Sequence, residues 1–333
     1  MEYSSSIYAE RLAAFQEDMA VLSGADFKNL PDLTGAINHR GGEPARKSLE
    51  SGFYLAPEAF QALAKEDTAR IQMTPNDALK VTREDSRHQV FLGRLDFIGQ
   101  DGCVAYQESV AVKSKEANQK ELAMYQLLGA LGINTFHPFG FAVMENGNRH
   151  LLTKVRKQVT SIDAIEWKAL CPEEIWVTCQ AGVETEVLLN RHGLFAGDLE
   201  FKNVATEESG RPVVVDPEFM TSYREVMDEL LHRVGDIKAL QDPQVSIGLG
   251  AVTRTMGIDF TALTNSYRRY AMPALPHKLR PKNTDQLFDA LKRTFYNPYR
   301  DMLTPDMQYY PVLRHAFDAL LLKRKEQART GTL

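Results

Sequence analysis

The sequence predicts an α+β fold built from two lobes, and three observations carry this prediction. A chain of 333 residues is long for one compact core and suits two lobes with a cleft between them. From Ala78 to Lys113 the apolar residues recur with a period of two, as in the strands of an antiparallel sheet. After Phe219 the spacing becomes mainly helical. The predicted divisions are an N-terminal helical extension at 1–77, a small lobe with a sheet and one helix at 78–157, and a mostly helical large lobe at 158–333.

Within the small lobe, strong turn signals separate the candidate strands. Gly99–Gly102 and Asn146-Gly147 are typical of hairpin turns. The predicted strands are 78–81, 88–98, 103–113, 139–145 and 149–155. An apolar stripe with a period near 3.6 predicts a helix over Glu116–Leu131. In the extension, similar spacing predicts helices over Ser4–Leu22 and Pro57–Ile71.

The large lobe is expected to begin with a helix over 172–190 that His192-Gly193 ends. Two short buried strands, Val204–Ala205 and Pro212–Val215, flank a turn and predict a hairpin. Val245–Ala251 is apolar and contains glycine. Further helices are predicted at 225–241, 260–272, 285–295 and 311–324.

Composition excludes several classes of protein. A net charge of −5 argues against binding to nucleic acid or to an anionic membrane surface through bulk charge. Cys103, Cys171 and Cys179 lack the spacing of a disulfide framework or a zinc site, which favours a reducing compartment. Residues 1–20 show no signal peptide, and no apolar run approaches the roughly 18 residues of a membrane span. We therefore expect a cytoplasmic protein without a membrane span.

Three oxygen-bearing side chains surround the predicted hairpin of the large lobe. Asp198 and Asn203 precede its first strand, and Asp216 follows its second strand. Closure of the hairpin would carry Asn203 and Asp216 to neighbouring positions. Two carboxylates and an amide oxygen suit a hard cation such as Mg²⁺ that carries phosphate oxygens.

The spacing Asp198-x4-Asn203, followed by Asp216 after an apolar run, resembles the catalytic and metal-binding loops of the protein-kinase-like superfamily. Val110-Ala111-Val112-Lys113 resembles the Val-Ala-Ile-Lys signature of the same superfamily. The sequences of these motifs are most similar to those of the bacterial aminoglycoside-phosphotransferase-like and lipopolysaccharide-core kinases. Ala196 replaces the histidine of the family pattern, and Asp216-Pro217-Glu218 replaces Asp-Phe-Gly. The resemblance implies a bilobal kinase-like fold with ATP and Mg²⁺ as cofactors.

The resemblance also implies a role for individual residues. Asp198 would accept the proton of the acceptor hydroxyl, and Lys202 would lie near the transferred phosphoryl group. The implied metal ligands are Asn203, Asp216 and Glu218. Lys113 would bind phosphates and pair with Glu121, or with Glu116 as the alternative.

The remaining implied contacts concern adenine, the phosphate loop and support of the catalytic loop. Ala111 would form the floor of the adenine site, and the backbone at Thr153 and Val155 would hold adenine. Counting strands places the phosphate loop at 82–87, where the candidate ligands are Thr82, Ser86 and Arg87. Asp228 or Asp236 would support the catalytic loop from the following helix.

The function implied is transfer of the γ-phosphoryl group of ATP to a hydroxyl of a small molecule, a sugar or a lipid-linked sugar. One alternative is a kinase-like binding or scaffolding protein, because Ala196 and the glycine-free phosphate loop depart from the family pattern. Another is a protein kinase or an AMP-transferase acting on a protein. The expected partners are a nucleotide and a hydroxyl-bearing acceptor, with a protein partner under the alternatives and no nucleic acid.

Overall fold

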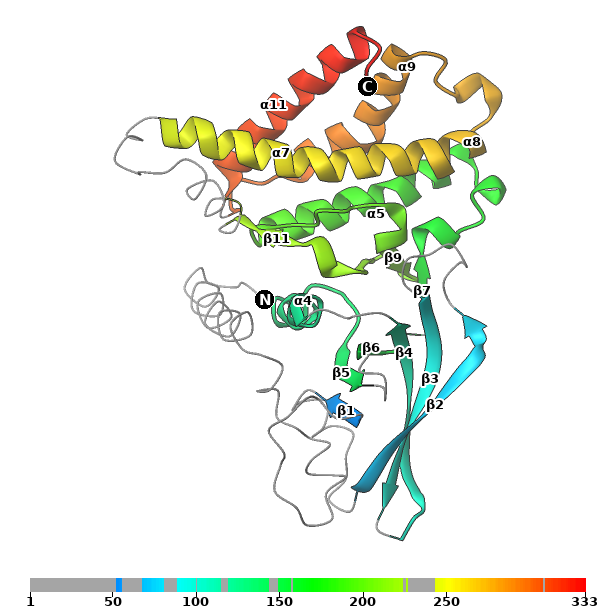
Figure 1. Cartoon of the computed structure of the whole chain (residues 1–333). Coiled ribbons are helices and arrows are strands. Elements are labelled where there is room, and N and C mark those ends of the chain that lie inside the picture. The colour runs from blue at the N-terminus through cyan, green and yellow to red at the C-terminus, as the bar shows by residue number, and fades with distance from the viewer. Residues whose placement is uncertain are drawn as a thin grey trace. The chain divides into compact units, whose positions relative to one another are not determined.

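The computed structural model of the chain is shown in Figure 1. It describes residues 52–55, 68–80, 89–99, 101–114, 119–143, 149–156, 158–223, 226, 243–307 and 309–333. The first of two compact units holds the described residues up to Ala130 and those from Phe136 to Arg156. The second holds Leu131–Thr135 and the described residues from Gln158 onward. The α+β class with an antiparallel sheet is confirmed.

The first unit contains a six-stranded antiparallel sheet in the order β1-β5-β6-β4-β3-β2. Its strands are β1 (Gly52–Leu55), β2 (Thr68–Lys80), β3 (Gln89–Gly99), β4 (Val104–Ser114), β5 (Pro138–Val143) and β6 (Arg149–Lys154). The predicted hairpin between β3 and β4 is confirmed. Gly102 adopts φ +79° in its turn, where its N–H donates to the Gly99 carbonyl at 3.0 Å.

Both edge strands of this sheet come from the part of the chain that the sequence predicted to be a helical extension. The expectation of helix was wrong for Thr68–Ile71, which belong to β2, and the strand predicted at 78–81 begins ten residues earlier. Pro75 argues against a strand at this position, because proline is rare in sheets. It is tolerated here because β2 pairs only with β3 and lies at the edge. The predicted helix Ser4–Leu22 lies outside the described residues.

Helix α4 (Gln119–Ala130) packs on the sheet through Leu122 and Tyr125, which cluster with Leu151 of β6. Leu151 is directly opposite Lys113 of β4 in the antiparallel register, so both side chains lie on the face that carries α4. The helix was predicted correctly, apart from its first three residues, which are not described.

The second unit is mainly helical, as predicted. The α-helices of its described residues are α5 (Pro172–Arg191), α7 (Pro243–Ser266), α8 (Met272–Ala274), α9 (Thr284–Leu291), α10 (Asn297–Met302) and α11 (Tyr310–Arg329). α7 and α11 lie side by side (Figure 1), and Phe260 of α7 packs against Phe317 of α11. Phe260 also contacts Tyr299 of α10, so the three helices share one aromatic core.

One helix prediction needs correction, because the helix predicted at 260–272 begins at Pro243 and ends at Ser266. Val245–Ala251, predicted as a separate apolar segment, forms the first turns of α7, which continues without a break to Ser266. A strong packing face lets the helix tolerate its glycines. The predicted helix 225–241 lies outside the described residues, apart from Val226. None of the helices in the described part of the chain is both long and apolar enough to cross a bilayer.

Several short strands pack against α5. β7 (Val159–Ser161), β9 (Val204–Glu207) and β10 (Pro212–Val214) form one sheet in the order β10-β9-β7, and β8 (Leu194–Phe195) pairs with β11 (Thr221–Ser222). The Leu131–Thr135 segment extends the first of these sheets. Val214 N–H donates to the Asn134 carbonyl at 2.9 Å, and Thr135 Oγ1 donates to the Val214 carbonyl at 2.8 Å.

Candidate active site

The β9–β10 hairpin brings two of the three predicted oxygen ligands together. Val204 pairs with Val214, and the Val215 N–H donates to the Asn203 carbonyl at 3.0 Å. Asn203 and the residue before Asp216 are therefore bonded neighbours across the hairpin. The proximity predicted from the two short apolar runs is confirmed.

Asp198 and Asn203 form a second direct contact. Asn203 Nδ2 donates to the Asp198 carbonyl at 2.8 Å and to Asp198 Oδ2 at 3.1 Å. Lys202 Nζ lies 3.5 Å from the same carboxylate oxygen and 3.0 Å from Glu200 Oε2. Burial raises the pKa of Asp198, while the Lys202 ammonium and the Asn203 hydrogen bond oppose that rise.

The segments that carry Asp198 and Asp216 leave from paired strands and then touch. Phe195 of β8 pairs with Thr221 of β11. Two residues after Phe195, Gly197 adopts φ +74°, and a Cβ added there would lie 2.2 Å from the Phe219 carbonyl oxygen. Glycine is therefore required at this position both by the backbone conformation and by the close approach.

Asp216 has φ +56° and ψ +65°, the one positive φ outside glycine in the described part of the chain. A non-glycine residue rarely occupies this left-handed region, and such strained positions cluster at functional sites. Pro217 follows it and starts a short 3-10 turn that ends at Phe219. The turn directs the chain back toward Gly197.

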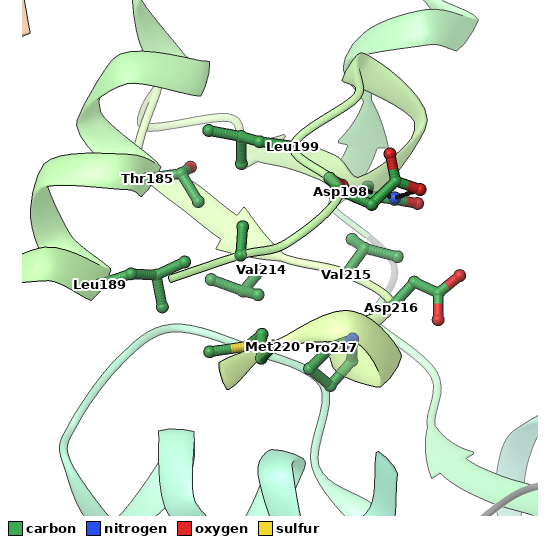
Figure 2. A pocket seen from close by; sticks show the side chains of 11 residues that line it. Thr185, Leu189, Asp198, Leu199, Val214, Val215, Asp216, Pro217 and Met220 are labelled. Carbon is green, nitrogen blue, oxygen red and sulfur yellow. Dashed lines mark hydrogen bonds between the residues drawn. The ribbon is translucent and has the colours of Figure 1, made fainter. Parts of the chain in front are cut away.

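A small pocket joins these residues, and Figure 2 shows the carboxylates of Asp198 and Asp216 pointing toward the same side of it. Leu189, Leu199, Val214 and Met220 form an apolar wall. Asn203 also lines this pocket, whereas Glu218, half-buried in the 3-10 turn, is not part of the lining.

The donor set of the pocket fits a magnesium ion. The amide nitrogen of Asn203 is occupied by Asp198, which leaves its amide oxygen as the atom for a metal. With the carboxylate of Asp216 this gives the hard oxygen ligands that Mg²⁺ prefers. Mg²⁺ usually keeps several waters and binds through one or two carboxylates plus substrate phosphates, so oxygens of this kind would complete the coordination.

Helix α7 supports the Asp198 loop from below through Asp259, a residue that the sequence analysis did not single out. The backbone N–H groups of Gly197, Leu199 and Ala196 face the Asp259 carboxyl, although neither of its oxygens reaches strict hydrogen-bond geometry. Burial raises the pKa of Asp259, and these N–H groups oppose the rise. The sequence analysis had expected this support from Asp228 or Asp236, which lie outside the described residues.

A second support comes from the last residue of the same helix. The Phe201 N–H donates to Ser266 Oγ at 3.0 Å in a buried environment. The Phe201 ring stacks on Trp167 at 5.5 Å and on Tyr270 at 6.2 Å. Because Lys202 and Asn203 follow directly, these contacts fix the backbone that presents them.

We expect Ser266→Ala to destabilise the protein by about 1–3 kcal/mol, because it leaves the buried Phe201 N–H without an acceptor. Thermal unfolding measures this effect. The matched control is Thr255→Val on the same helix, since the Thr255 hydroxyl only donates to the Ala251 carbonyl one turn earlier. Equal stability losses in the two variants would contradict the assigned role of Ser266.

The first unit gathers several of the residues predicted to bind nucleotide. Lys113 Nζ lies 2.8 Å from Glu121 Oε1, so the predicted pair is present, with side chains 13% and 2% exposed. Ala111 is opposite Thr153 in the register, on the same face as Lys113. The Val155 N–H donates to the Ser109 carbonyl at 3.4 Å. Glu116, Thr82, Ser86 and Arg87 lie outside the described residues.

Comparison with models of known protein families gave no match, and a search of characterised proteins also gave none. The assignment of function therefore depends on the geometry of the sites and on the motifs.

Proposed function

We propose that this protein is an ATP- and Mg²⁺-dependent phosphotransferase of the protein-kinase-like class that acts on a hydroxyl group. The observation that carries the proposal is the arrangement of Asp198, Asn203 and Asp216 around one pocket. Asn203 is bonded to Asp198 through its side chain and to Val215 through its backbone. Asn203 thus contacts the candidate base Asp198 and the residue that precedes the candidate metal ligand Asp216.

Each residue has a distinct part in the proposal. Asp198 orients the acceptor hydroxyl and takes its proton, and its half-buried carboxylate is held by Asn203 and Lys202. Lys202, between Asp198 and Glu200, offers positive charge to the transferred phosphoryl group. Asn203 and Asp216 would hold Mg²⁺, with Glu218 as a further candidate. A bound Mg²⁺ neutralises phosphate charge.

The first unit would contribute the nucleotide-binding part of this machinery. Lys113, fixed by Glu121 on a face that also carries Ala111 and Thr153, is the candidate ligand of the nucleotide phosphates. A small residue beside the lysine leaves space for a flat base. The adenine contacts of the Thr153–Val155 backbone and the phosphate contacts of Thr82, Ser86 and Arg87 belong to the same proposal.

The test is a thermal shift of the full chain with MgATP. Binding at a ligand concentration 100 times Kd stabilises a folded protein by about 2.7 kcal/mol. We expect Asp216→Ala to abolish the shift. The matched control is Glu208→Ala, an exposed acid in the turn of the same hairpin, which should retain it. No shift in the wild type at millimolar MgATP would favour the binding or scaffolding alternative.

Labelled ATP separates phosphotransfer from AMP transfer. Under the proposal, label in the γ-phosphate reaches the acceptor and label in the α-phosphate does not. Transfer of the α-label to a protein would instead identify an AMP-transferase. Incubation with metabolite and protein fractions in parallel would show which class of acceptor is used.

A further inference from the structure

A pair of buried acids lies beneath the candidate active site, and the proposed chemistry does not use it. Glu186 of α5 and Asp259 of α7 are both fully buried, at 0% exposure. Glu186 Oε2 and both carboxyl oxygens of Asp259 lack a hydrogen-bond partner among the described residues. Buried polar atoms are rarely left unsatisfied, so three such oxygens in one place call for an explanation.

The packing of the two helices brings these acids toward each other. A Cβ added at Gly182 of α5 would lie 2.6 Å from Leu263 Cδ2 of α7, so the helices approach closely at this point. Glu186 is one turn after Gly182, and Asp259 is one turn before Leu263, each on the same helix face. Figure 1 shows α5 and α7 as neighbouring helices. Burial raises the pKa of Glu186, and the charge of Asp259 raises it further, as expected for two carboxyls within electrostatic reach.

The groups around the pair favour a proton on Glu186 rather than on Asp259. Glu186 Oε1 accepts one hydrogen bond from Asn190 Nδ2 at 3.0 Å, and Tyr299 Oη donates to Asn190 Oδ1 at 2.5 Å. Asp259 faces three backbone N–H groups of the Asp198 loop, which favour its ionised form. Among the described residues, the charge of Asp198 also acts on Asp259 and opposes its ionisation.

We propose that Glu186 is protonated at neutral pH and donates this proton from Oε2 to a carboxylate oxygen of Asp259. One shared proton satisfies two of the three orphaned oxygens, because Glu186 Oε2 becomes a donor and one Asp259 oxygen becomes its acceptor. The other Asp259 oxygen is left to the backbone N–H groups of the Asp198 loop. The pair is a positioning group: it fixes the Asp259 carboxylate against the backbone N–H groups of Ala196, Gly197 and Leu199. Its existence does not depend on the reaction proposed for the pocket.

Infrared spectroscopy of the full chain at neutral pH tests the protonation directly. We expect the carbonyl band of a protonated carboxylic acid in the wild type, lost in Glu186→Gln and retained in Asp259→Asn. The matched control is Glu184→Gln, a half-buried acid on the same helix, which should keep the band. Absence of the band in the wild type would overturn the proposal, and loss in Asp259→Asn alone would overturn the assignment to Glu186. If Asp259→Asn does not fold, the Glu186→Gln result decides.

The pH dependence of unfolding gives an independent readout. A carboxyl whose folded pKa is raised keeps its proton while the unfolded chain loses it, so stability falls as pH rises above about 4.3. Each retained proton raises the unfolding equilibrium constant about tenfold per pH unit until the folded pKa is reached. Glu186→Gln can still donate to Asp259 and should fold, with a slope smaller by one proton. Equal slopes in wild type and variant would show that Glu186 is ionised when folded and overturn the proposal.

Discussion

Asp198→Asn should lower the rate of phosphoryl transfer from MgATP by about 100- to 10,000-fold, the usual contribution of a general base. Asparagine keeps an oxygen for the hydrogen bond from Asn203 Nδ2 but cannot accept the proton of a hydroxyl. We therefore expect the loop to keep its structure and the MgATP thermal shift to persist. Release of labelled phosphate to water, with and without a metabolite extract, measures the effect.

Glu200→Gln is the matched control for this substitution. Glu200 also pairs with Lys202, at 3.0 Å, but it does not line the pocket. It should leave the rate nearly unchanged, and similar losses in the two variants would contradict the role of Asp198. The wild-type rate should also fall as pH drops through the pKa of Asp198. Because burial raises that pKa, the fall should begin at a higher pH than for an ordinary aspartate.

Gly197→Ala should destabilise the second unit by about 4 kcal/mol or more, near the upper end for single substitutions. The left-handed conformation alone costs alanine about 1–2 kcal/mol. Its Cβ would in addition lie 2.2 Å from the Phe219 carbonyl oxygen, an atom of the backbone that no side-chain rotation can remove. Relief requires the segments that carry Asp198 and Asp216 to move apart, so the MgATP shift should be lost as well.

Gly210→Ala separates these two causes. Gly210 has φ +80° in the β9–β10 turn, but a Cβ there meets nothing within 4 Å. We expect only the conformational penalty, about 1–2 kcal/mol, and an intact MgATP shift. Urea unfolding of both variants gives the comparison. A loss for Gly197→Ala no larger than that for Gly210→Ala would show that the close approach is not a constraint.

Local patterns were sufficient to predict the hairpin and the lysine–glutamate pair. The β9–β10 hairpin follows from two short apolar runs around a turn, and its closure places Asn203 beside Val215. Glu121 lies on the edge of the apolar stripe of α4, where a buried carboxylate needs a cation. Lys113 supplies it because alternation puts that side chain on the face that α4 covers.

The contacts that support the Asp198 loop from a distant part of the chain could not be predicted in the same way. Asp259 and Ser266 contact the Asp198 loop because α7 packs beneath it, and nothing in the spacing of either residue signals that contact. A signal was available only in the polarity of Asp259, an acid between apolar neighbours on the buried face of a helix. Most of β2 was missed for a different reason: Pro75 argues against a strand unless the strand is known to lie at an edge.

The Leu131–Thr135 segment has a practical consequence for dissecting this protein. Although it precedes β5 and β6 in the chain, it belongs to the second unit, where Asn134 and Thr135 bond the edge of β10. A recombinant fragment cut at Gln158 would therefore expose the Val214 amide and carbonyl two residues before Asp216. The two units are interleaved in sequence. A single truncation therefore cannot isolate either unit without removing part of the other.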